Sequence, residues 1–139
     1  MKTKAFPQLL FVAFWLLLLA GCATTPTQKP EDLVTPLTKL TSAVEALVRY
    51  PDPDNPVPDY RLVTEAIKDK PELQRAFRGL PIKVNHDARN VVLLVCSPDG
   101  KYAWLEDASW TLGVDRKWYL SNPPRPAEFT LDPAQRKSR

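Results

Sequence analysis

The sequence predicts a small α+β domain, in which N-terminal helices precede an antiparallel sheet of about three strands. Two observations indicate this class. Between Leu37 and Phe77, outside the proline-rich residues 51–58, apolar residues recur every three or four positions, as on helices that pack on one side. From Ile82 onward, the pattern changes to short runs rich in β-branched residues, which are separated by a turn. Helices followed by strands, rather than alternating with them, favour an α+β fold.

The N-terminus has three parts in the order typical of an export signal. Lys2 and Lys4 supply positive charge, Leu9–Ala20 is an unbroken apolar run, and Gly21 and Cys22 follow. The run is shorter than the ~20 residues that a resident transmembrane helix needs. Small residues before the cysteine suit a cleavage site. We therefore expect residues 1–21 to be a signal peptide.

The four residues Leu19-Ala20-Gly21-Cys22 resemble the lipobox of bacterial lipoproteins. The resemblance covers residues 1–22 and implies diacylglycerol on the Cys22 sulfur, cleavage just before Cys22, and acylation of the new amine. Several acyl chains, palmitate among them, make membrane attachment effectively permanent. In that family, an aspartate after the lipidated cysteine retains the protein at the inner membrane. Ala23 occupies this position, which implies the periplasmic face of the outer membrane.

Removal of residues 1–21 leaves 118 residues, enough for one domain. The removed segment holds two of the 19 basic residues and no acidic residue. The mature chain therefore has 17 basic and 16 acidic side chains. This balance gives no electrostatic reason to expect binding to nucleic acid.

With Cys22 lipidated, Cys96 has no partner within the mature chain. We expect it to be buried and reduced; the alternative is a disulfide to another molecule.

Composition divides the mature chain into three parts. Residues 22–35 are small, polar and interrupted by proline, which predicts a flexible tether. Residues 36–120 hold the periodic patterns and form the predicted domain. Residues 121–139 hold four prolines and few apolar residues, so we expect a partly disordered tail.

The first helix is predicted to begin near Thr35. Its apolar residues Leu37, Leu40, Val44 and Leu47 are spaced by three or four positions and form one stripe. The stripe packs against the same domain or, alternatively, against a partner helix. Two heptads are too few to establish a coiled coil.

Four prolines within residues 51–58 then exclude helix and predict a stiff loop, which lacks the spacing of a calcium loop. Asp59 is placed to cap a second helix, whose inner face carries Leu62 and Ala66. A third short helix is predicted over residues 71–78. Pro71 opens it, and Gly79 follows where a left-handed residue is needed.

Three strands are predicted after the helices. Ile82 and Val84 alternate with polar residues, as in a half-buried strand. Residues 91–96 are continuously apolar, as in a strand that is buried on both faces. The sequence Ser97-Pro98-Asp99-Gly100 predicts a tight turn, and residues 101–106 return, so residues 91–106 form a hairpin.

Two groups of residues resemble catalytic pairs, but their expected positions argue against catalysis. His86 and Asp87 are expected in a solvated turn, whereas Cys96 ends a buried strand, where burial disfavours thiolate. Glu106 and Asp107 are neighbours on a strand and should point to opposite faces. There is no zinc-type cysteine or histidine spacing and no glycine-rich phosphate loop. We therefore expect no enzyme activity, no cofactor and no metal.

Aromatic residues are concentrated near the end of the predicted domain. Tyr102, Trp104, Trp110 and Trp118 are candidates for an exposed binding surface, with Tyr102, Trp104 and Glu106 expected on one face of their strand. They could also form the core of the domain. Two hypotheses follow. The protein acts through non-enzymatic contacts with another envelope protein, or it binds a cell-wall glycan or small envelope ligand through these aromatic residues.

Overall fold

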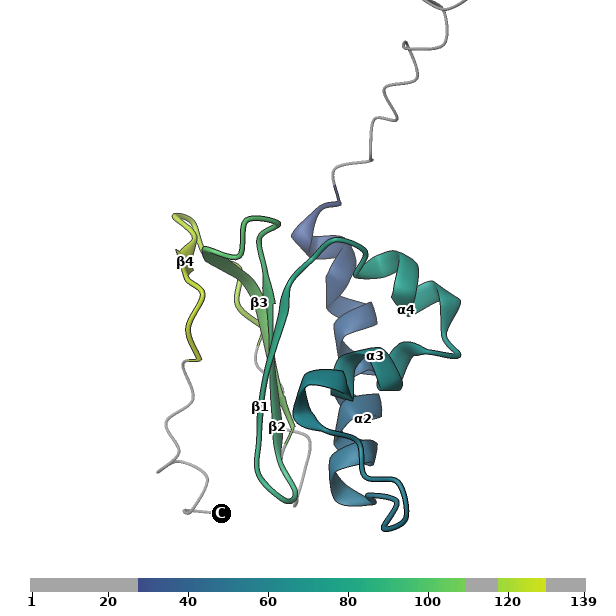
Figure 1. Cartoon of the computed structure of the whole chain (residues 1–139). Coiled ribbons are helices and arrows are strands. Elements are labelled where there is room, and N and C mark those ends of the chain that lie inside the picture. Colours follow the sequence, from purple (N-terminus) through teal and green to yellow (C-terminus); the bar gives the residue numbers. More distant parts are fainter. Residues whose placement is uncertain (1–27, 110–117, 130–139) are drawn as a thin grey trace, which may run out of the picture.

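The structure, a computed structural model, describes residues 28–109 and 118–129. Within them, three helices cover one face of a four-stranded antiparallel sheet (Figure 1). The α+β class and the order of helices before strands are confirmed, but the sheet has four strands rather than about three. The signal peptide, Cys22, Trp110 and residues 130–139 lie outside the described residues.

The helical layer begins earlier than predicted. A short 3-10 helix, η1 (Pro30–Leu33), leads directly into α2 (Val34–Arg49). Residues 30–35, which the sequence analysis placed in the tether, are therefore helical, and Thr35 is not the cap. The reason is Leu33, which extends the stripe of Leu37, Leu40 and Val44 by one turn and is fully buried with them.

Two short helices complete this layer. Asp59 opens the 3-10 helix η2 (Asp59–Arg61), which continues into α3 (Leu62–Ile67), but its side chain makes no capping hydrogen bond. The third helix, α4 (Pro71–Ala76), begins with Pro71 as predicted. Gly79 has a φ of +75°, which confirms the left-handed residue expected after this helix.

The strands form a meander in chain order. β1 (Ile82–His86) pairs with β2 (Val91–Cys96), and β2 pairs with β3 (Tyr102–Ser109). The hairpin predicted over residues 91–106 is present, and β3 continues to Ser109. Gly100 in its turn has a φ of +72°, as expected for that position.

A β-bulge in β3 changes which side chains share a face. Val95 pairs with Leu105, whereas the next residue, Cys96, pairs with Ala103, so Trp104 is an extra residue between them. Trp104 packs with the core between the sheet and the helices, although it was expected on the face of Glu106. The strict alternation assumed from the sequence fails at this one position.

The fourth strand, β4 (Arg125–Pro126), comes from the segment that was expected to be a tail. It pairs with the start of β3, and the chain then runs over the sheet face that the helices leave uncovered (Figure 1). We call residues 125–129 the covering segment. Its Phe129 packs on the outer face of β2 and β3, and the Lys83 ammonium donates to the Ala127 carbonyl at 2.7 Å. Apolar contact and hydrogen bonds thus attach this part of the predicted tail to the domain.

Both faces of β2 are buried, as its continuous apolar sequence predicted. Val91, Leu93 and Val95 face the helices, and Val92, Leu94 and Cys96 face the covering segment. All six are at most 1% exposed. In the part of the chain that the structure describes, no helix is long and apolar enough to span a membrane.

Candidate binding groove

A groove is lined by residues from the C-terminal turn of α2. This end of α2 lies opposite η1 (Figure 1). Three separate segments border the groove: the C-terminal turn of α2, the proline-rich loop with η2 and α3, and the turn between β1 and β2. It encloses about 350 Å³. Its lining is mainly apolar, with one histidine and two aspartates: Leu47, Val48, Pro51, Pro56, Val57, Asp59, Leu62, His86, Asp87 and Ala88.

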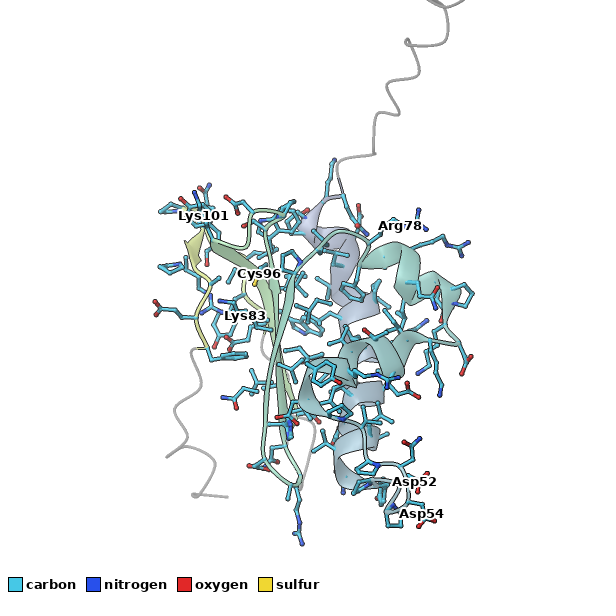
Figure 2. All side chains as sticks on the ribbon, viewed as in Figure 1. Asp52, Asp54, Arg78, Lys83, Cys96 and Lys101 are labelled. Atoms are coloured by element: carbon cyan, nitrogen blue, oxygen red, sulfur yellow. The ribbon has the colours of Figure 1, made fainter. Side chains whose placement is uncertain are left out.

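The first wall of the groove is the loop of residues 51–58. Its four prolines each fix φ. The Asp52 carboxylate accepts a hydrogen bond from the Asp54 N–H at 3.0 Å, and the Asp52 carbonyl accepts one from the Asn55 N–H at 3.3 Å. Figure 2 shows Asp52 and Asp54 at this end of the molecule. The loop is thus shaped before any ligand arrives, which lowers the entropy cost of binding.

The opposite wall is the turn between β1 and β2, and Asp87 organises it. One Asp87 carboxylate oxygen accepts hydrogen bonds from the N–H groups of Arg89 at 2.8 Å and Asn90 at 2.9 Å. The Asn90 side-chain amide donates to the other oxygen at 3.0 Å. Asp87 therefore acts as a turn-building residue.

His86 joins the two walls. It is the last residue of β1 and 25% exposed, rather than part of a solvated turn as expected. Its Nε2 lies 3.1 Å from Oδ1 of Asp59, whose side chain is 85% exposed. The lining contains no hydroxyl, thiol or amine side chain that this imidazole could activate.

The structure does not bring together either of the two catalytic pairs that the sequence suggested. His86 pairs with Val91 at one end of β2, whereas Cys96 lies at the other end, about 16 Å away along the strand. Glu106 and Asp107 are both fully buried but point to opposite faces, as expected. Glu106 binds Arg125 on the outer face, and Asp107 lies opposite Leu93 on the helix-facing side. Among the described residues, no group of histidine, cysteine and acidic side chains could hold a metal ion.

The structure describes three of the four aromatic residues of the predicted surface. Tyr102 is 45% exposed and Trp118 is 37% exposed, whereas Trp104 is half-buried in the core. Trp110 lies outside the described residues.

The most exposed aromatic residues in the described part of the chain were missed by the sequence analysis. They are Tyr50 and Tyr60, at 75% and 85% exposure, and they flank the proline-rich loop beside the groove. Their position next to helix-breaking prolines is the signal that could have identified them, because neither residue continues an apolar stripe.

Cys96 is fully buried on the outer face of the sheet, as predicted (Figure 2). Burial raises the pKa of its thiol, so less of it is thiolate at neutral pH. We expect Cys96→Ala to lower the free energy of unfolding by about 1 kcal/mol, because the smaller side chain leaves a small cavity. Urea denaturation of the two proteins measures this difference.

A second measurement tests the reduced state of Cys96. Cells are lysed in an alkylating reagent, and the protein is examined on a non-reducing gel. It should migrate as a monomer. A major disulfide-linked species that disappears in the Cys96→Ala protein would contradict this expectation.

Comparison with known proteins adds no relative to this description. The chain matches no protein-family model, no curated protein and no solved structure.

Proposed function

We propose that this protein is an envelope lipoprotein, anchored by lipid on Cys22, that binds another envelope protein through the groove at the far end of its domain. The observation that carries the binding role is the groove itself. Two stiff walls, an apolar floor and two exposed tyrosines lie together at one end of a small domain. Exposed aromatic residues beside an apolar depression are typical of protein interfaces.

The orientation of the domain supports this assignment. The described chain starts at Gln28, beside η1, and α2 carries it about 24 Å to the groove. Eight Cα–Cα steps separate Cys22 from Pro30, so they span at most about 29 Å. An anchor on Cys22 therefore keeps the η1 end within that distance of the membrane, and the groove lies at the other end of α2, where a partner can reach it. With Ala23 after the anchor, the proposed location is the periplasmic face of the outer membrane.

The binding role is preferred to catalysis because the lining offers a histidine and two aspartates but no nucleophile, and Asp87 is engaged in its turn. Glycan binding is the second candidate, and the exposure of Tyr102 and Trp118 favours it. The two candidates use different ends of the molecule. Tyr102 lies at the start of β3, whereas His86 and the groove lie beside its end.

Crosslinking in living cells tests the proposal. Photoreactive benzoylphenylalanine in place of Tyr60 should give a discrete crosslinked protein after irradiation, because this exposed residue directly follows Asp59, which lines the groove. The same group in place of Tyr102 is the matched control, since it replaces an exposed aromatic residue at the other end. We expect no such product there.

Two outcomes would contradict the proposal. One is the absence of any product from position 60. The other is retention of the protein on purified peptidoglycan that is lost when Tyr102 and Trp118 are replaced by alanine, which would favour the glycan candidate.

A further inference from the structure

The groove has an apolar floor and a rim that carries carboxylates. Leu47, Val48 and Val57 line the floor as half-buried extensions of the core. Four aspartates stand around them on the two walls: Asp52 and Asp54 in the loop, Asp59 at η2 and Asp87 in the turn. An apolar floor selects apolar side chains, and its rim selects the charge of the residues that flank them.

The basic residues nearby do not neutralise this rim. The Arg49 guanidinium is bound by the Glu45 carboxylate at 3.1 Å, so this pair adds no net charge. Arg61 lies 3.6 Å from Glu65, within the helical segment that carries both residues. Among the described residues at this end, Arg89 is the one further arginine. Asp52, Asp54 and Asp59 against Arg89 leave the groove end of the described domain with a net negative charge, without counting Asp87.

The exposure of these carboxylates leaves them accessible to a partner. The side chain of Asp59 is 85% exposed even though it contacts His86, and Asp52 and Asp54 are exposed at the tip of the loop. Asp52 and Asp87 use carboxylate oxygens to hold backbone N–H groups, which fixes where their charges lie. The charges are therefore presented on preorganised walls, as in interfaces that steer a partner by complementary charge.

We propose that the groove binds a segment of an envelope protein in which apolar side chains are flanked by lysine or arginine. The apolar side chains enter between the proline-rich loop and the β1–β2 turn, and the basic groups meet the aspartates on the rim. This inference rests on the proposed function, since it specifies the chemistry of the partner that the groove receives.

The test extends the crosslink from position 60. The full-length protein carries benzoylphenylalanine at that position, and the crosslinked residue of the partner is mapped by mass spectrometry. We expect it to lie within a few residues of at least two lysines or arginines and of apolar side chains. Replacing Asp54→Asn and Asp59→Asn together should reduce the yield of this product about fivefold, because two complementary charges are lost. The asparagine oxygen can still accept a hydrogen bond at His86.

The matched control is Asp69→Asn, which removes an exposed carboxylate from the turn between α3 and α4, away from the groove. It should leave the yield unchanged. A product that maps to an acidic or uncharged segment, or a yield that the double substitution does not lower, overturns the inference and leaves the proposed function standing. No product at all overturns both.

Discussion

Replacing Arg125 with alanine is expected to lower the free energy of unfolding by about 3 kcal/mol. The Arg125 guanidinium lies 2.8 Å from the Glu106 carboxylate, which is fully buried on the outer face of the sheet. Arg125 itself is 18% exposed. Removing it takes a hydrogen-bonded counter-charge away from a carboxylate that water does not reach. This cost is large because breaking one side of a buried ion pair leaves the other charge less well compensated than it is in water.

Arg125 also attaches the covering segment to the rest of the domain. Its guanidinium lies 4.8 Å from the centre of the Tyr119 ring, and it donates to the Glu128 carbonyl at 3.3 Å. The alanine variant should therefore lose order in residues 125–129 before the hairpin unfolds. Hydrogen exchange should be faster at Ala127, whose N–H donates to the Lys101 carbonyl at 3.0 Å.

Two further variants separate charge from packing. Arg61→Ala removes an exposed arginine from its pair with Glu65 and should leave the urea midpoint unchanged within error. Arg125→Met combined with Glu106→Leu removes both buried charges and should recover most of the lost stability. If Arg125→Ala unfolds at the same urea concentration as the unaltered protein, the ion pair does not support the fold.

The helices and the hairpin could be predicted from the sequence because local spacing determines them. The stripe of Leu37, Leu40 and Val44 has one compatible period, and residues 91–96 are too short and too β-branched for a helix in this setting. Gly79 and Gly100 marked two positions where the described chain adopts a left-handed conformation. Each of these features is visible within a window of about ten residues.

The features that the sequence did not reveal depend on contacts between distant residues. β4 is two residues long and is held by β3, by Phe129 on the sheet and by the pair between Arg125 and Glu106. Proline content alone suggested a disordered tail there. The bulge at Trp104 has no local sign either, because Tyr102 to Glu106 alternate like any regular strand. Pairing with β2 is what places Trp104 with the helices.

The groove was missed for the same reason. Its residues come from three segments that span positions 47 to 88, and each segment on its own looks like a helix end, a stiff loop or a turn. The aromatic surface, by contrast, was predicted from closeness in sequence. The bulge places Trp104 against the core, whereas Tyr102 and Trp118 are exposed. Closeness in sequence thus could not show which of these side chains reach the surface.

The largest effect of any single substitution is expected for Cys22→Ser, which should abolish lipid attachment completely. Serine lacks the thiol that receives diacylglycerol in the lipoprotein family that residues 19–22 resemble. Without acyl chains, the described part of the domain offers no membrane-spanning helix. Growth with an alkyne-tagged fatty acid should therefore label the unaltered protein, and Cys22→Ser should remain unlabelled and unprocessed at that bond.

The chain provides its own control for this experiment because it has two cysteines. Cys96→Ala should keep the full label, since Cys96 is fully buried in the folded domain.

On a sucrose gradient, the labelled protein should sediment with outer-membrane markers, because Ala23 stands where an aspartate would retain a lipoprotein at the inner membrane. Label that persists in Cys22→Ser would disprove the anchor. Sedimentation with inner-membrane markers would instead disprove the location alone. In that second case, the lipid anchor on Cys22 and the proposed binding role of the groove would both still stand, because neither depends on which membrane holds the protein.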